Sequence, residues 1–138
     1  MARVLIVEDS ELLLRIMLDA IEAGGHEVIT AGDGEVALKR FIEEKPDLLI
    51  TDCLIPKMDG FKLVKNIREF EAPQRTPVVM TSAIYRKASY RDVAMEAGAD
   101  LYLTKPTNPE EYREFAQRVD RLLETVTGGV VSQEVPRS

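Results

Sequence analysis

The chain has 138 residues, 45% of them hydrophobic and 30% charged, so we expect one soluble globular domain rather than a disordered chain. Its net charge of −6 argues against direct binding to nucleic acid, which needs clustered Lys and Arg side chains. No apolar run approaches the ~20 residues that cross a bilayer, and no signal-peptide pattern begins the chain, so we expect a cytoplasmic protein without a membrane partner. The single cysteine, Cys53, excludes an internal disulfide.

The first half of the chain predicts three strands and two helices. Residues 4–7 are a short run of Val, Leu and Ile that is typical of a buried strand. Ser10 can then cap a helix that the Gly24-Gly25 pair ends. The elements that follow are a second strand at 26–30, a turn at 32–34, a helix over 35–44 and a third strand at 48–51.

The second half continues the alternation, with a helix at 61–70, a strand at 77–81, a helix at 87–97 and a strand at 101–103. The last helix has the clearest start, because Asn108 can cap it, Pro109 suits its first position and Glu111 completes a capping box. It should end near residue 125, and Gly128-Gly129 then begin a polar tail. We therefore expect one domain over residues 1–127 and a flexible tail or linker stub at 128–138.

This alternation of apolar strands with helices predicts a parallel sheet that is covered by helices on both faces. Because crossovers between parallel strands are right-handed, the favoured fold is a doubly wound, open α/β sheet in three layers. In such sheets functional groups gather at the carboxyl ends of the strands, near the point where the winding direction reverses. The strand ends are therefore the first place to look for a site.

Polar side chains follow four of the five predicted strands. They are Glu8, Asp9, Asp52, Thr81, Ser82, Thr104 and Lys105. A polar residue at one strand end is most simply part of a solvated loop. A set of three carboxylates, hydroxyls and an ammonium group on the same edge is better explained by a shared function.

The charges of this set indicate its chemistry. Two carboxylates about 4 Å apart repel each other by about 4 kcal/mol at an effective dielectric constant near 20, so Glu8 and Asp9 need a proton or a cation between them. Oxygen ligands without a nearby histidine favour Mg²⁺. Lys105 suits an incoming phosphoryl oxygen, and the Thr81 hydroxyl can donate to another. The pattern indicates a phosphoryl-transfer pocket in which the nucleophile is a carboxylate.

Four motifs carry a family resemblance. In chain order, "VLIVEDS", "LLITDCLIPKMDG", "VVMTSA" and "LYLTKP" resemble the receiver domains of two-component response regulators over residues 3 to about 125. The resemblance implies a chemotaxis-regulator-like, flavodoxin-like fold, with five parallel strands in the order 2-1-3-4-5 and five helices. It also implies that Asp52 accepts a phosphoryl group from a histidine kinase or a phosphotransfer protein. Apart from catalysing its own phosphorylation and slow dephosphorylation, such a domain is not an enzyme.

The same resemblance implies a metal site. Glu8, Asp9, Asp52 and the backbone carbonyl of Leu54 would hold Mg²⁺, for which Mn²⁺ can substitute. Leu54 also stands where receiver domains place a side chain that flanks the path of the hydrolytic water.

Further roles follow from the resemblance for residues of the last two strands. Thr81 and Lys105 would contact the phosphoryl group, and Thr81 with Tyr102 would form the switch. Ala83, like Leu54, would flank the hydrolytic water and cannot hydrogen-bond to it. The switch would remodel the face made by the fourth helix, fifth strand and fifth helix, where a downstream protein docks. We expect a monomer or weak dimer, either a stand-alone receiver or a fragment of a longer regulator.

Other interpretations fit less well. A haloacid dehalogenase-type phosphatase needs an Asp-x-Asp nucleophile on its first strand, and a flavodoxin needs a phosphate-binding first loop that two carboxylates would repel. A degenerate receiver that binds partners without phosphorylation is the alternative left open. Among single residues, Cys53 is expected to be a small buried hydrophobe, Asp59-Gly60 a turn and helix start, and His26 a surface residue without chemistry.

Overall fold

The computed structural model describes residues 2–71, 75–83 and 89–125. The strands are β1 (Arg3–Val7), β2 (Glu27–Ala31), β3 (Leu48–Asp52), β4 (Val78–Ser82) and β5 (Leu101–Thr104). The helices are α1 (Glu11–Glu22), α2 (Gly34–Glu44), α3 (Gly60–Glu71), α4 (Ser89–Ala97) and α5 (Pro109–Leu123).

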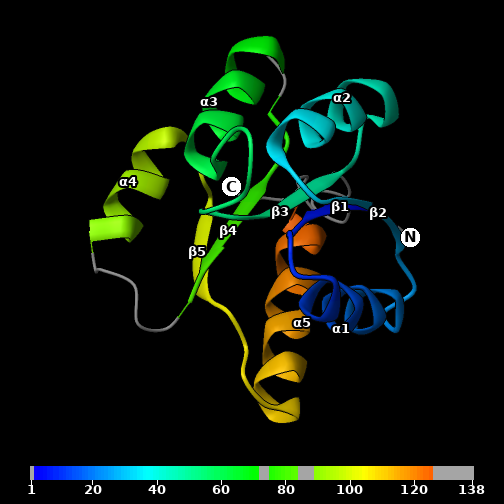
Figure 1. The fold of residues 1–138 in the computed structure, drawn as a ribbon. Coiled ribbons are helices and arrows are strands. Elements are labelled where there is room, and N and C mark those ends of the chain that lie inside the picture. The colour runs from blue at the N-terminus through cyan, green and yellow to red at the C-terminus, as the bar shows by residue number, and fades with distance from the viewer. Residues whose placement is uncertain (1, 72–74, 84–88, 126–138) are drawn as a thin grey trace.

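The five strands form one parallel sheet in the order β2-β1-β3-β4-β5 (Figure 1). This confirms the predicted doubly wound α/β fold in three layers. The chain reverses its winding direction between β1 and β3, so the carboxyl ends of these strands lie at the switch point of the sheet. Asp52 ends β3 opposite Thr81 of β4, which brings the predicted acceptor and the predicted hydroxyl to the same edge.

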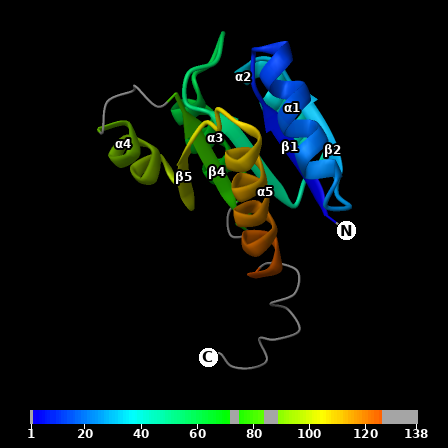
Figure 2. The ribbon, with the colours of Figure 1, turned by 90° about the horizontal axis from the view of Figure 1, so that it is seen from below.

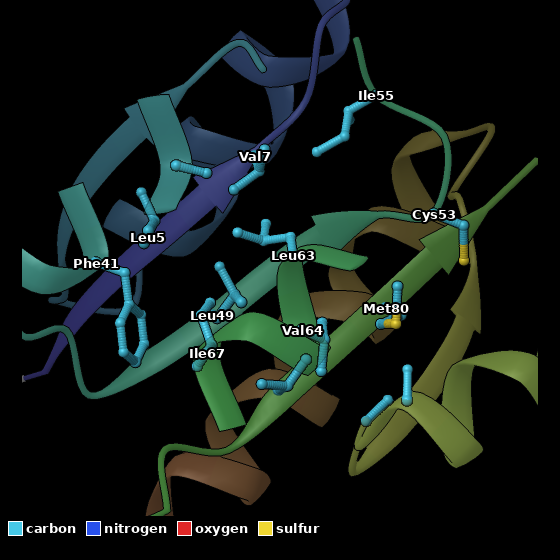
Figure 3. Close-up of a cluster of buried hydrophobic side chains, with 14 of the residues drawn as sticks. Leu5, Val7, Phe41, Leu49, Cys53, Ile55, Leu63, Val64, Ile67 and Met80 are labelled. Atoms are coloured by element: carbon cyan, nitrogen blue, oxygen red, sulfur yellow. The ribbon is translucent and has the colours of Figure 1, made fainter. Parts of the chain in front are cut away.

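Two apolar clusters cover the two faces of the sheet. Helices α2, α3 and α4 pack on one face of the sheet, around Leu5, Leu49 and Met80. Figure 3 shows this cluster, in which Leu63, Val64 and Ile67 of α3 are directed at the strands. Helices α1 and α5 lie together on the other face (Figure 2), where they bury a second cluster. The members of the second cluster include Val4, Ile6, Met17, Ile21, Ile50, Val79, Phe115 and Val119. Because every central strand is apolar on both faces, it reads as a continuous hydrophobic run.

Most helix starts follow from their capping residues. The side chains of Ser10, Asp33 and Asn108 accept hydrogen bonds from the backbone N–H groups of Leu13, Val36 and Glu111. Asp59 does the same for Lys62 at the start of α3, with a distance of 2.8 Å, which confirms the predicted turn and helix start.

The predicted capping box of α5 differs in one contact. The Glu111 carboxylate accepts from the backbone N–H and the hydroxyl of Thr107, both at 2.9 Å, instead of from the N–H of Asn108. These hydrogen bonds lower the pKa of Glu111.

The predicted boundaries differ from the observed ones by one or two residues, and two of the residues at these boundaries are informative. Gly34, placed in a turn by the sequence, is the first residue of α2. His26, predicted at the surface, precedes β2 with a side chain only 13% exposed, and its Nε2 lies 2.8 Å from Asp120 of α5. Residues 87–88 of the predicted fourth helix and the predicted tail at 128–138 lie outside the described residues.

Candidate phosphoryl-transfer site

The site begins with three carboxylates that two neighbouring strands bring together. Glu8 and Asp9 directly follow β1, and Asp52 is the last residue of β3, which pairs with β1. One oxygen from each of the three carboxylates lies within 4.8 Å of the other two. Glu8 and Asp52 are buried, and Asp9 is exposed at the mouth of the site. The arrangement is the one that the sequence predicts at this edge.

Lys105 supplies the cation between two of these carboxylates. Its Nζ lies 2.9 Å from Glu8 Oε1 and 2.9 Å from Asp52 Oδ2. Its backbone N–H donates to the carbonyl of Ser82 at 2.8 Å, so the segment after β5 is fastened to the end of β4 and the side chain is aimed at the acids. Sequence reasoning assigned Lys105 to an incoming phosphoryl oxygen and missed its pairing with Glu8.

Burial and pairing oppose each other in this cluster. Burial raises the pKa of Glu8, and pairing with Lys105 only partly offsets the effect. Burial would lower the pKa of Lys105, but its pairing with Asp52 and Glu8 outweighs burial and raises that pKa. The lysine is therefore held fully charged, whereas the ionised form of Glu8 is disfavoured. One ammonium group thus leaves the negative charge of the three carboxylates only partly compensated, and a further cation would be bound favourably there.

Thr81 presents a hydroxyl that is available to a ligand. Its side chain is buried beside Asp52, and Oγ1 has no hydrogen-bond partner in residues 2–71, 75–83 and 89–125. Its own backbone carbonyl accepts from the N–H of Cys53 at 2.9 Å, which fixes the ends of β3 and β4 relative to each other. A buried hydroxyl without a partner is costly, and it gains a hydrogen bond when an acceptor oxygen arrives.

The segment between β3 and α3 begins at the site, because it directly follows Asp52. Leu54 lies in this segment and is half-buried. At its far end, the N–H of Gly60 donates to the carbonyl of Cys53 at 2.8 Å. A Cβ at Gly60 would lie 2.2 Å from the carbonyl oxygen of Asp52, so only glycine permits this approach. The start of α3 thus packs directly on Asp52, the predicted acceptor.

Cys53 is fully buried next to Asp52, and burial raises the pKa of its thiol to about 12. The thiol is therefore protonated at neutral pH, and the prediction of a small buried hydrophobe is confirmed.

Tyr102 is half-buried on β5 and packs against the cluster that α2, α3 and α4 cover. Its hydroxyl hydrogen-bonds to the hydroxyl of Ser82, the last residue of β4. From the sequence, Ser82 is expected only as a polar strand end. In the register it is the partner of Thr104, and Tyr102 lies two residues before Thr104, so the two hydroxyls meet diagonally across the strand pair. No pattern in the sequence indicates this contact.

The donor set fits a hard divalent cation. All three nearby acids offer oxygen, one of them is exposed enough to leave room for metal-bound water, and His26, the single histidine, lies beside Asp120 instead. Lys105 and Thr81 then remain as donors for the oxygens of a transferred group. The geometry can therefore support attack by a carboxylate on a phosphoryl group.

Comparison with known proteins agrees with this chemistry. Residues 4–117 match the family model described as the response regulator receiver domain. The chain is therefore a receiver domain of the response regulator family, the class of protein that relays two-component signals.

Particular relatives support the assignment. The chain is 38% identical over 109 residues to the alkaline phosphatase synthesis transcriptional regulatory protein PhoP of Bacillus subtilis (strain 168), covering 79% of this chain and 44% of PhoP. It is 34% identical to the solved chemotaxis protein CheY4 of Vibrio cholerae, with a TM-score of 0.75 and coverage of 86% and 98% of the two chains. The Mn²⁺-bound structure of response regulator Rcp1 is 26% identical, with a TM-score of 0.77 and coverage of 91% and 97%.

The chain thus spans less than half the length of PhoP. Within the described part of the chain, no helix has both the length and the apolar character needed to cross a membrane.

Proposed function

We propose that this receiver domain takes a phosphoryl group onto Asp52 from a histidine kinase or a phosphotransfer protein and thereby switches a protein-binding surface. The observation that carries the proposal is the convergence at one sheet edge of a buried carboxylate, an ammonium group 2.9 Å from it and a buried hydroxyl without a partner among the described residues. A cluster that served only to stabilise the fold would not leave the Thr81 hydroxyl without an acceptor.

The transfer balances without a further reactant. An oxygen of the Asp52 carboxylate attacks the phosphorus of a phosphohistidine that is protonated on its other ring nitrogen. A P–O bond forms, the P–N bond breaks, and the imidazole leaves as a neutral ring with the bonding electron pair. Lys105 then exchanges part of its contact with Asp52 for the phosphoryl oxygens. The Thr81 hydroxyl donates to another of these oxygens. Both groups stabilise charge that increases at the transferred group.

The reaction is proposed to require Mg²⁺, with Mn²⁺ as a substitute. Glu8, Asp9, Asp52 and the Leu54 carbonyl would hold the ion, which supplies positive charge to the acceptor and the phosphoryl oxygens. Two observations support this role, namely the three carboxylates within 4.8 Å and the Mn²⁺ found in the similar structure of Rcp1.

The proposed output is a change in the face made by α4, β5 and α5. Thr81 lies beside the proposed acceptor, and Tyr102 lies on the adjacent strand β5, one residue before Leu103, the register partner of Thr81. A displacement of Thr81 would therefore reach this face through a short path. A downstream protein would dock there. Binding to nucleic acid by the chain itself is not part of the proposal, although PhoP is named as a transcriptional regulator.

Phosphorylation by acetyl phosphate tests the proposal. With Mg²⁺, the wild-type protein should gain one phosphoryl group that hydroxylamine removes, as expected of an acyl phosphate. Asp52→Asn should abolish the label, and Asp59→Asn, which alters an exposed acid of the neighbouring loop that can still cap α3, should keep it. A label that persists on Asp52→Asn would move the acceptor elsewhere. No label on any protein would favour the degenerate receiver.

A further inference from the structure

The N-terminus of α2 makes unusually close contact with the segment that follows β3. The N–H of Gly34 donates to the carbonyl of Pro56 at 3.1 Å, and Gly34 is buried. A Cβ at Gly34 would lie 2.2 Å from the carbonyl oxygen of Met58 and 2.6 Å from its Cβ. Glycine is therefore required at the start of α2 by the neighbouring loop and not by the helix itself.

The loop that meets Gly34 is itself tightly wound. The N–H of Met58 donates to the carbonyl of Pro56 at 2.7 Å, and Lys57 between them has a left-handed φ of 70°. The Lys57 ammonium also lies 3.9 Å from the carboxylate of Asp33, the residue that caps α2. Three consecutive loop residues are thus held by the first residues of one helix.

We infer that Gly34 is a positioning residue for the metal site and that the N-terminus of α2 holds the β3–α3 loop in the shape that presents the Leu54 carbonyl. The inference rests on the proposed function, because it concerns the ion that Asp52 and Leu54 would share. Gly34 touches none of the proposed ligands and acts through Pro56 and Met58.

The direction of the effect follows from which atoms can move. At 2.2 Å, a new methyl group must displace its neighbour, and here the neighbour is backbone and cannot rotate away. The far end of the loop is fixed by the contact of Gly60 with Asp52 and Cys53. A displacement caused at Gly34 is therefore taken up between Leu54 and Met58, where the carbonyl ligand lies.

Direct measurement of metal binding tests the inference without any assay of phosphorylation. Free Mn²⁺ is followed by electron paramagnetic resonance during titration of the full chain, at a temperature where circular dichroism shows each variant to be folded. Gly34→Ala should weaken Mn²⁺ binding by about ten-fold or more, as is typical when a supporting residue behind a metal ligand is changed.

Two control variants separate positioning from stability. Gly32→Ala adds the same methyl group to the same connection, but no atom of the described residues lies within 4 Å of the added Cβ, so its affinity should equal that of wild type. Val119→Ala removes buried volume on the opposite face of the sheet and should lower the melting temperature without changing the affinity.

The outcomes are distinguishable. Wild-type protein that binds no Mn²⁺ would overturn the proposed function itself. Wild-type binding that Gly34→Ala retains in full would overturn only the role of Gly34. If Gly34→Ala does not fold, Lys57→Gln decides, because it removes the ion pair to Asp33 and keeps a long side chain at the left-handed position. It should weaken binding by about two- to five-fold, the range for an exposed ion pair, and an unchanged affinity would refute the inference.

Discussion

At the scale of single residues, the site is an ionic cluster in which burial and charge conflict. Lys105 pairs with two carboxylates at once but carries one positive charge, and a third carboxylate, that of Asp9, lies within 4.8 Å of these two. Glu8 bears the largest cost because it is only 2% exposed, and burial raises its pKa despite the lysine. In the folded protein without metal, ionisation of Glu8 therefore lowers the free energy of unfolding. Such a cost is tolerated at functional sites, and a bound cation is the proposed function here.

Glu8→Gln removes a buried negative charge and is therefore expected to raise the free energy of unfolding of the metal-free protein at neutral pH. The expected gain is about 0.5–2 kcal/mol, the usual range for a single stabilising substitution. Lys105 keeps Asp52 as its partner in this variant. The same substitution should weaken Mg²⁺ binding, since a carboxylate ligand is lost. Urea unfolding in EDTA measures the first effect and Mg²⁺ titration the second. A loss of stability in EDTA would mean that the ion pair with Lys105 outweighs the burial of Glu8.

The pH dependence of this difference has a defined sign. A carboxyl group whose pKa is raised in the folded state binds its proton more tightly there than in the unfolded chain. Its contribution to stability is therefore largest at low pH. That contribution is lost as the pH rises above 4.5, the ordinary value, and through the raised pKa. The advantage of Glu8→Gln over wild type in EDTA should therefore grow from pH 4.5 toward neutrality. An advantage that is constant over this range would point to packing instead of charge.

Hydrolysis of the acyl phosphate is expected to be slow because two neighbouring side chains cannot orient water. Leu54 is half-buried next to the acceptor, and Ala83 lines an apolar hollow together with Lys105. A water-orienting group is worth up to about 10²–10⁴-fold when it acts as a general base and less when it only positions the water. The purified phosphoprotein should last minutes or longer in Mg²⁺. The double variant Leu54→Asn, Ala83→Glu should decay faster, and wild-type decay within seconds would show that these positions do not set the rate.

At the scale of elements, β4 and β5 form the proposed route from the acceptor to the surface. Thr81→Ala should still accept the phosphoryl group but should lose the chemical-shift response around Tyr102, because the hydroxyl that would move toward the phosphoryl oxygen is absent. Thr30→Ala on β2 is the matched control. A response that survives in Thr81→Ala would place the coupling in the Ser82–Tyr102 contact, which Ser82→Ala would then remove.

The end of α4 is fixed to α3 by one arginine. The Arg68 guanidinium donates to the carbonyl of Gly98 at 2.6 Å and to that of Thr76 at 2.6 Å, and it pairs with Glu71 and Asp100. Its side chain is only 17% exposed, so removing it leaves several acceptors poorly solvated. Arg68→Ala should therefore lower the free energy of unfolding by about 2–3 kcal/mol.

Arg15→Ala is the matched control for this variant. Arg15 pairs with Asp19 on the exposed face of α1, and both side chains are well solvated. The loss there should stay within about 0.5 kcal/mol in the same urea titration. Equal losses in the two variants would show that the Arg68 contacts contribute no more than a surface ion pair.

At the scale of the whole molecule, the fold could be predicted because its signals are local. The apolar run of β3, the cap at Asn108 and the regular alternation of elements each depend on a few adjacent residues. Parallel topology then places Asp52 and Thr81 on one edge without further information. This is why the members of the site were predictable as a group.

The remaining features depend on contacts between distant parts of the chain. The pairing of Lys105 with Glu8 joins residues that are 97 positions apart, and the packing of Gly34 on Met58 joins the start of α2 to the loop after β3. Neither leaves a periodic pattern in the sequence. The pairing of His26 with Asp120 is of the same kind, which explains why that histidine was wrongly placed at the surface.

Mg²⁺ should stabilise the whole domain, because the ion would bind carboxylates that only the folded chain brings within 4.8 Å of each other. At ten times its dissociation constant the gain is about 1.4 kcal/mol, which corresponds to roughly 3–6 °C in the melting temperature of a domain of this size. Thermal melts of the full chain with EDTA and with millimolar Mg²⁺ measure it. Asp9→Asn should lose most of the shift, and Asp19→Asn, which changes an exposed acid of α1, should keep it. If Mg²⁺ leaves the melting temperature of the wild type unchanged, or shifts Asp9→Asn equally, the carboxylates at the carboxyl edge of the sheet do not hold the ion.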